Sequence, residues 1–218
     1  MTTDLPNGQE SPLSESQVLT LGAKQSSWRM IECSIPHRLC SNSHVCIDGV
    51  VYFVVKTGAD LSQRSLVKFD LRYEKLDFVT SLPADMPCLR GCCSFINYEG
   101  KVAIPTRASG NTFNVWVIDQ AAPKHGWLKL SFSTESWNIL SMLRIYGFTH
   151  TGEFVLAPKY YSGHFNVILY NTNTKGLRKI KVDVKGDYEF MHGRRTKAVV
   201  FSEYIESICK RDSFHSLR

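Results

Sequence analysis

Three glycine-containing turns recur along the chain at a nearly constant spacing. They are Asp48-Gly49, Glu99-Gly100 and Thr151-Gly152, and their glycines are 51 and 52 residues apart. Each turn separates two short runs rich in Val, Ile, Phe and Tyr, which is the pattern of a β-hairpin. A tight hairpin turn needs a positive φ, which glycine adopts without the clash that a Cβ causes. The spacing therefore predicts a β module that repeats about every 50 residues.

A second pair of strands is expected after each hairpin. The third strand ends in an acidic or amide residue, and a turn and a fourth strand follow; these ends are Phe69-Asp70, Ile118-Asp119 and Tyr170-Asn171. Such a side chain accepts hydrogen bonds from the N–H groups of a turn, which explains Asp70 and Asp119 better than the alternative of an acid–base pair. Four strands per ~50 residues is the period of a kelch-type β-propeller blade, and a β-sandwich with evenly spaced hairpins is the alternative fold.

Parts of further modules flank the three repeats. VLTLG (18–22) and SSWRMIEC (26–33) predict the outer strand pair of another blade, and KAVVFSEYIESI (197–208) predicts an isolated strand. Residues 18–208 hold roughly four blades, whereas a kelch ring usually has about six or seven. We therefore expect an all-β fold, an incomplete β-propeller-like array of about four four-stranded antiparallel blades, with one apolar blade face unpaired. A single helical turn is expected in SWNILSML (136–143).

Positive charge is concentrated near the C-terminal end. Residues 175–218 hold eleven Lys and Arg against six Asp and Glu, and residues 1–174 hold fifteen against fourteen, which together give the net charge of +6. We interpret this stretch as a solvated basic face, with a nucleic-acid-binding surface as the alternative; its main members are Arg178, Lys179, Lys181, Arg194, Arg195, Lys197, Lys210 and Arg211. The expected domains are a disordered acidic leader (1–16), the propeller-like domain (17–208) and a tail (209–218).

The cellular compartment is inferred from targeting signals and cysteines. The chain has no apolar run of the ~18 residues that a membrane helix needs, and its first residues lack the charged and apolar regions of a signal peptide. Its seven cysteines are an odd number without a secretory context. We interpret them as reduced thiols of a cytoplasmic or nuclear protein.

At this level of detail the sequence resembles the plant F-box-associated domain family, the propeller-like type 3. The resemblance rests on Trp28-Arg29, Pro36-His37, Asp48-Gly49-Val50 and the run from Trp116 to His125-Gly126-Trp127. The matching stretches follow the family's order: 18–37, 46–53, 65–79, 95–104, 115–129, 147–158 and 165–182, with 199–208 similar to the closing strand. Trp28, Trp116 and Trp127 have the apolar body and single N–H donor suited to packing between blades.

The resemblance implies a non-enzymatic protein-interaction module that recognises substrates for SCF-type ubiquitin ligases. The region before Val18 is too short and too polar for an F-box, so we expect the C-terminal half of such a domain, without direct binding to the ligase adaptor. A truncated, non-functional paralogue is an alternative. Partner-binding loops are expected at 56–64, 105–112 and 158–164, which join the second and third strands of each module; plain connecting loops are the alternative. Membrane binding is not expected.

No catalytic, cofactor-binding or metal-binding residues are assigned. Glycine-rich phosphate loops, nucleophile elbows and metalloprotease motifs are absent from the sequence. The spacing of Cys33, His37, Cys40, His44 and Cys46 admits a zinc site, but it lacks paired Cys-x2-Cys units, and buried thiols with loop histidines are the preferred interpretation. Reactive cysteines near Arg90 (Cys88, Cys92, Cys93) and a general base at His125 were considered and not adopted.

Overall fold

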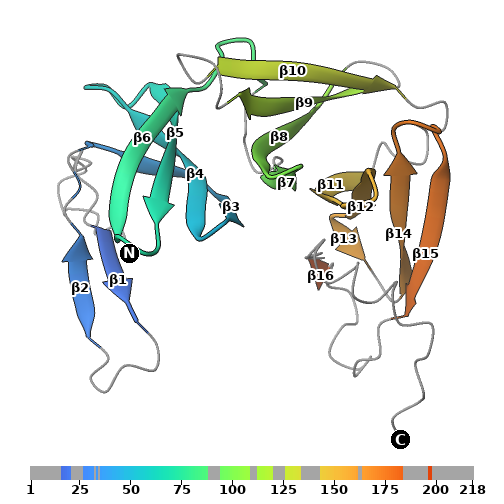
Figure 1. Cartoon of the computed structure of the whole chain (residues 1–218), viewed down its shortest axis with the longest axis horizontal. Helices are drawn as coiled ribbons and strands as arrows, with labels where there is room; N and C mark the ends of the chain where they lie inside the picture. The colour runs from blue at the N-terminus through green and yellow to red at the C-terminus, as the bar shows by residue number, and fades with distance from the viewer. Residues whose placement is uncertain are drawn as a thin grey trace, which may run out of the picture. The chain divides into compact units, whose positions relative to one another are not determined.

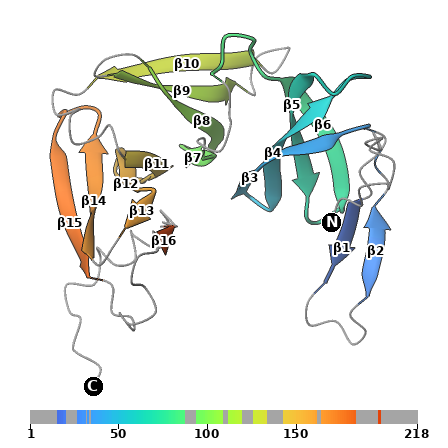
Figure 2. The same cartoon turned by 180° about the vertical axis from the view of Figure 1, so that it is seen from behind.

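All regular structure in the described part of this computed structural model is β-strand. The described residues are 16–20, 27–31, 33, 35–87, 94–108, 112–119, 126–133, 143–161, 164–183 and 196–197. They contain no apolar helix of the length that crosses a membrane. Figure 1 shows the strands in chain order, and Figure 2 shows them from behind.

The described residues form three four-stranded antiparallel sheets in succession, and we call them blades 1 to 3. Their strand orders are β3-β4-β5-β6, β10-β9-β8-β7 and β11-β12-β14-β15. Blade 1 comprises β3 (Arg38–Ile47), β4 (Val50–Thr57), β5 (Gln63–Asp70) and β6 (Lys75–Ser81). Blade 2 comprises β7 (Ile96–Tyr98), β8 (Lys101–Arg107), β9 (Thr112–Asp119) and β10 (Gly126–Ser133). Blade 3 comprises β11 (Leu143–Phe148), β12 (Glu153–Pro158), β14 (His164–Asn171) and β15 (Leu177–Asp183).

Two strand pairs accompany the blades. β1 (Ser16–Leu19) pairs with β2 (Trp28–Ile31), as the sequence predicts for an outer strand pair. β13 (Tyr160–Tyr161) pairs with β16 (Thr196–Lys197), which the sequence did not predict because each strand has two residues. The prediction of an all-β array of four-stranded antiparallel blades is confirmed.

The middle strands of blades 2 and 3 are more deeply buried than the fourth strands. In blades 2 and 3 the strands β8, β9, β12 and β14 contain runs of consecutive buried residues, whereas the fourth strands β10 and β15 alternate between half-buried and exposed residues. A strand alternates when one face meets water, and it is continuously apolar when both faces are covered. The middle strands therefore have both faces covered, and the fourth strands form the wetter edge.

Glycine and its neighbour make the three hairpin turns in two ways. Asp48 and Gly49 both have positive φ (50° and 77°), as do Glu99 and Gly100 (53° and 79°). Positive φ at both central residues is the mark of a two-residue type I′ turn, whose twist suits a hairpin. In the third turn only Gly152 is left-handed (φ 83°). The predicted glycine turns are confirmed, and the third is a longer loop.

The chain divides into two compact units, each with its own core. Unit 1 comprises 1–93 and 118–128, and unit 2 comprises 94–117 and 129–218. In unit 1, Val55, Val67 and Leu76 form a buried cluster on one face of blade 1, against which Cys33 and Ile35 pack.

The core of unit 2 is an aromatic interface between blades 2 and 3. Phe154 is fully buried there, and its ring centroid lies 4.8 to 5.2 Å from those of Phe113, Phe132 and Phe148. Edge-to-face pairs of this kind stabilise by roughly 0.5–1.5 kcal/mol each beyond the area that they bury. Packing of neighbouring blades face to face is thus directly seen in unit 2.

The structure differs from the sequence-based expectation at three residues. Trp28 was expected to pack between blades, but its side chain is 65% exposed, so this prediction is wrong. Ser16, assigned to the leader, is the first residue of β1. Leu143, assigned to a helical turn, begins β11. The rest of the leader, of 136–143 and of 198–208 lies outside the described residues.

Candidate protein-interaction loops

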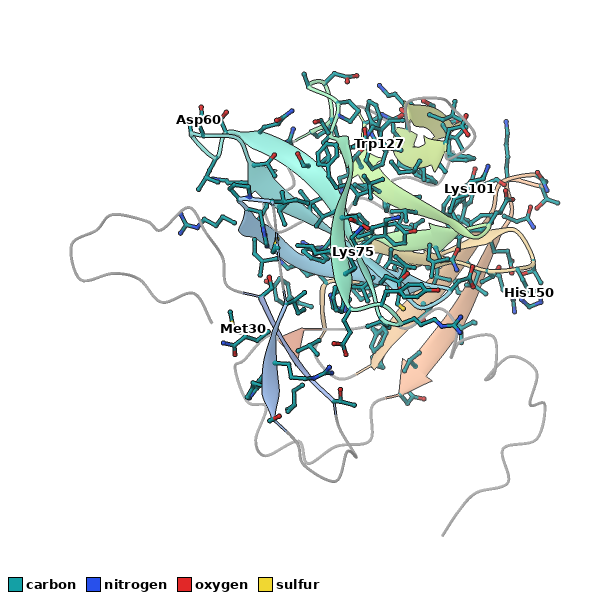
Figure 3. The ribbon with its side chains drawn as sticks, turned by 60° about the vertical axis from the view of Figure 1, so that its left-hand side comes forward. Met30, Asp60, Lys75, Lys101, Trp127 and His150 are labelled. Atoms are coloured by element: carbon teal, nitrogen blue, oxygen red, sulfur yellow. The ribbon has the colours of Figure 1, made fainter. Side chains whose placement is uncertain are left out.

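The β4–β5 loop of blade 1 is short and internally hydrogen-bonded. The strands continue to Thr57 and from Gln63, so the connecting segment is 58–62 rather than the predicted 56–64. Leu61 N–H donates to Gly58 O (3.2 Å), and Ser62 N–H donates to Asp60 Oδ1 (3.2 Å). Gly58 has φ 89°, a conformation that side chains disfavour. The loop is therefore a preformed turn, with Asp60 at its tip (Figure 3).

The charge of Asp60 is favoured by this turn. Hydrogen bonds from Ser62, first from its side chain and then from its backbone, lower the pKa of Asp60 below the usual value of an aspartate. Donors that bind a carboxylate stabilise its ionised form. Asp60 therefore presents a fixed negative charge to solvent at neutral pH.

Polar contacts hold the base of this loop. Thr57 and Ser65, both buried, share a hydrogen bond of 2.7 Å between their hydroxyl oxygens. The guanidinium of Arg64 donates to Met86 O (3.1 Å), and the amide of Gln63 donates to Ser81 Oγ (2.8 Å). These contacts tie the loop to the end of β6 and to the segment that follows it, which keeps the loop on a rigid base.

The corresponding loops of unit 2 lie at one end of that unit. The β8–β9 loop closes with a hydrogen bond from Ala108 N–H to Thr112 O (3.2 Å). Arg107 donates to the carbonyl of Leu143, the first residue of β11, which pairs with Pro158 at the start of the β12–β14 connection. The predicted loops 105–112 and 158–164 are again shorter than expected, because β8 extends to Arg107 and β13 lies inside the second.

Tyr160 is the exposed aromatic residue of the β12–β14 connection. It is 44% exposed, and the ammonium of Lys159 lies 4.8 Å from the centroid of its ring. Tyrosine and a nearby cation form a surface that suits a protein partner, because tyrosine adds contact area at a low entropic cost. Sequence reasoning named this loop but not this residue.

Of the three tryptophans predicted to pack between blades, Trp127 joins two blades, whereas Trp116 is buried and hydrogen-bonded within its own blade. Trp116 is buried, and its indole N–H donates to Thr106 Oγ1 (3.1 Å) while Lys129 lies over its ring (5.0 Å). Trp127 of β10 donates to the carbonyl of Ser81 in β6 (2.9 Å), which joins two blades within unit 1. These residues belong to the scaffold of sheets from which the loops extend.

The opposite ends of the blades are made of side-chain-capped turns. Asp70 Oδ1 accepts hydrogen bonds from Arg72 N–H (2.8 Å) and Tyr73 N–H (3.0 Å). Asn171 Oδ1 does the same for Asn173 and Thr174, both at 3.0 Å. The predicted turn role of Asp70 is confirmed, and the turn after Asp119 lies outside the described residues.

Sequence reasoning missed the exposed Leu71 and Tyr73 in the first of these turns. They are 51% and 73% exposed, and Arg72 lies 5.9 Å from the Tyr73 ring centroid. Arg29 of β2 forms an ion pair with Glu74 of the same turn (2.5 Å). This contact links the β1–β2 pair to the turn between β5 and β6. An exposed apolar pair in a turn leaves a weak signal, because surface apolar residues are common.

The cysteine and histidine cluster is not assembled as a metal site. Nδ1 of His37 lies 2.8 Å from Ile35 O and 3.5 Å from Cys33 Sγ. A carbonyl can only accept, so Nδ1 carries the proton and cannot bind a metal in this arrangement. In the described parts of the chain, no three His, Cys, Asp or Glu side chains are grouped for metal binding.

The expected environments of this cluster are partly wrong. His37 lies in the loop before β3, as expected, and is buried there. His44 lies in β3 rather than in a loop, and Cys46 is exposed rather than buried. Cys33 and Cys40 are half-buried. Residues 88, 90, 92, 93 and 125, the other positions considered for reactivity, lie outside the described residues.

Among the described residues, the other groups with a shifted pKa are tyrosines. Burial raises the pKa of Tyr52, Tyr98, Tyr146 and Tyr170 above the ordinary value of 10.0. General acid–base catalysis needs a group with a pKa near the working pH, and these shifts move away from neutrality. The described geometry thus offers preformed loops on stacked sheets, which suit binding.

Four-stranded antiparallel blades with buried middle strands define a domain of the β-propeller class. The sequence matches the F-box associated beta propeller domain over residues 4–205, and the chain belongs to this family.

Relatives in Arabidopsis thaliana agree with this assignment. The chain is 53% identical over 200 residues to F-box protein At4g11590, a match that covers 89% of the chain and 49% of the relative. It is 42% identical over 217 residues to putative F-box protein At5g15660, covering 99% and 49%, and 32% identical over 203 residues to F-box protein DOR, covering 89% and 49%. The chain spans about half the length of these relatives.

Proposed function

We propose that the chain is a non-enzymatic protein-interaction module that recognises a substrate-type partner through its strand-two-to-strand-three loops. The observation that carries this proposal is the β4–β5 loop, a hydrogen-bonded turn with a fixed charge on a rigid sheet. A binding loop that is ordered before it meets its partner loses less entropy on binding. The family membership and the F-box names of the relatives support a recognition role.

The proposal extends to the setting of the interaction. Relatives named as F-box proteins suggest that recognition serves ubiquitination by an SCF-type ligase, in the cytoplasm or the nucleus. The family match assigns residues 4–205 to the associated domain, so the proposal gives these residues to partner recognition and not to binding of the ligase adaptor.

Affinity capture with matched variants tests the proposal. The tagged full chain is used to capture proteins from a plant extract. Asp60→Ala changes the loop itself, and Lys56→Glu changes an exposed residue of β4 two residues before the loop begins at Gly58. Each variant is expected to lose the partner that the unmodified chain retains. Lys75→Glu makes the same charge change at the start of β6, the opposite end of blade 1, and should retain it. Quantitative mass spectrometry measures the difference.

Two outcomes would overturn the proposal. If the Asp60 and Lys56 variants capture the partner as well as the Lys75 variant does, the β4–β5 loop is not part of the recognition surface. Capture of nucleic acid alone, with affinity that falls steeply with salt, would favour the basic C-terminal stretch instead. A partner that is retained at high salt and is lost with Asp60→Ala supports recognition by the β4–β5 loop.

A further inference from the structure

The turn between β5 and β6 exposes three consecutive side chains, and two of them are of the types that anchor interfaces. Leu71 and Tyr73 are 51% and 73% exposed, and Arg72 between them is exposed as well. The guanidinium of Arg72 lies 5.9 Å from the centroid of the Tyr73 ring. Tyrosine and arginine are enriched among the residues that supply most of the binding energy of protein interfaces.

Hydrogen bonds hold the backbone of all three residues. Asp70 Oδ1 accepts from the N–H groups of Arg72 (2.8 Å) and Tyr73 (3.0 Å). The N–H of Leu71 donates to the carbonyl of Gly49 in the neighbouring hairpin turn (3.0 Å). A surface that is ordered before it meets a partner loses less entropy on binding. The β5–β6 turn is therefore a preformed surface.

The equivalent turn of blade 3 shows that this conformation does not require the side chains at 71–73. Asn171 Oδ1 accepts from the N–H groups of Asn173 and Thr174, both at 3.0 Å, and each turn has a left-handed residue four positions after its cap. Positions 172–174 hold threonine, asparagine and threonine, which are ordinary residues for a turn. The same backbone thus forms with short polar side chains, and the exposed leucine, arginine and tyrosine of blade 1 need another explanation.

Arg72 is the charged residue of this turn whose side chain has no ion pair or hydrogen bond with a described residue. The other charged side chains of the turn are engaged: Glu74 with Arg29 (2.5 Å), Lys75 with Asp77 (3.1 Å), and Asp70 with the N–H groups of the turn. Asp48 of the neighbouring hairpin turn is exposed, but it forms no ion pair with Arg72 among the described contacts. A guanidinium binds a carboxylate through two parallel hydrogen bonds, so a carboxylate is the group that complements this turn.

We propose that the β5–β6 turn is a second interaction surface and that it binds a segment of a protein partner in which an aspartate or glutamate is flanked by apolar residues. The carboxylate pairs with Arg72, and the apolar residues beside it pack on Leu71 and Tyr73. β5 runs from the β4–β5 loop to this turn, so the two surfaces lie at opposite ends of blade 1 (Figure 1). The second surface does not depend on recognition by the β4–β5 loop.

Peptide binding to the full chain tests the proposal. The probes are short synthetic peptides with a central Asp, Asn or Lys between apolar or between polar residues, and fluorescence anisotropy measures their Kd. The unmodified chain should prefer a central Asp with apolar neighbours. The triple variant Leu71→Thr, Arg72→Asn, Tyr73→Thr, which gives this turn the residues of 172–174, should bind that peptide at least ~30-fold more weakly, the loss of an interface hot spot. Asp60→Ala, in the β4–β5 loop, is the control and should bind it unchanged.

Arg72→Glu reverses the charge of the turn. It should lose the Asp peptide and prefer the Lys peptide, a change of preference that a misfolded chain does not produce. Equal binding of the Asp and Asn peptides by the unmodified chain, or undiminished binding by the triple variant, overturns the proposal. So does a mass that rises above 24.8 kDa with concentration in the unmodified chain but not in the triple variant, because a second copy then occupies the turn. Circular dichroism verifies that the variants fold.

Discussion

At the scale of single residues, Asp70 and Asn171 show that a carboxylate and an amide can both cap the turn that follows a strand. Each accepts two backbone N–H groups of the following turn through its Oδ1 atom. Four residues later, each turn contains a left-handed residue, Glu74 (φ 51°) and Lys175 (φ 55°). The two turns thus share the same hydrogen-bond pattern and the same left-handed position, although their side chains differ.

This equivalence predicts the effect of changing Asp70. Asp70→Ala leaves the N–H groups of Arg72 and Tyr73 to water and should lower the free energy of unfolding by about 1 kcal/mol. Asp70→Asn keeps the acceptor and should change it by less than ~0.5 kcal/mol, as Asn171 already serves this purpose. Urea unfolding followed by tryptophan fluorescence measures both. A loss with asparagine equal to that with alanine would show that charge, not the accepted hydrogen bonds, matters there.

Residue-level inference from the sequence works where the cause is local. The positive φ of Gly49 and Gly100 and the capping by Asp70 follow from chemistry within four residues, and they are found as expected. The environments of Trp28 and Cys46 depend on what packs against them from other elements. Nothing in the residues beside them carries that information, and both expectations are wrong.

At the scale of elements, the hydrogen bond between Trp116 and Thr106 joins the middle strands of blade 2. Both side chains are buried, at 4% and 5% exposure, so water does not replace either partner easily. Thr106→Val leaves the indole N–H without its acceptor and should cost about 1–3 kcal/mol, and Trp116→Phe leaves the threonine hydroxyl without its donor. The double variant removes both groups and should cost clearly less than the sum of the two single changes.

A double-mutant cycle measures this coupling. The free energies of unfolding of the two single variants and the double variant give an interaction energy, expected to be about 1 kcal/mol. Strict additivity would mean that this side-chain hydrogen bond adds little to the backbone hydrogen bonds and packing that join the two strands. Thermal unfolding at neutral pH provides an independent second measure.

Element boundaries were predicted less well than element order. Four strands per module, in the same antiparallel order, follow from the hairpin glycines and the acidic or amide strand ends. The loops were placed too wide, because Thr57, Arg107 and other polar residues continue the strands through the sheet's hydrogen bonds. Polar residues at the end of a strand can be assigned to it only when the strand with which they pair is known. A single sequence does not show which strand that is.

At the scale of the whole molecule, tyrosines in both units share one electrostatic feature. Burial is the first cause of the raised pKa of Tyr52 in unit 1 and of Tyr98, Tyr146 and Tyr170 in unit 2. Carboxylates add to the effect at Tyr52 and Tyr98, where Asp48, Asp70 and Glu99 repel a phenolate. Arg144 opposes it at Tyr146. The folded chain therefore holds these phenol protons more tightly than the unfolded chain does.

The alkaline limit of stability follows from this difference. Between the ordinary pKa of about 10 and the raised values, the unfolded chain releases protons that the folded chain keeps, so the free energy of unfolding falls as pH rises. This stabilisation is fully present below pH ~10 and is lost as pH rises through the folded pKa values. Urea unfolding at a series of pH values from neutral to alkaline should show the decline.

Tyr170 is the position where this prediction is most specific. It is 2% exposed, burial is the cause of its shift, and its hydroxyl donates to Ser133 O (2.7 Å). Tyr170→Phe should lower stability at neutral pH by about 1 kcal/mol, because that hydrogen bond is lost, but it should also reduce the decline above pH ~10. Tyr73→Phe, at a residue 73% exposed, is the control and should alter neither. Phenylalanine has no hydroxyl to ionise, so the Tyr170 variant lacks the contribution of this residue to the pH dependence of the free energy of unfolding. If its alkaline decline is unchanged, the decline comes from the ionisation of other groups.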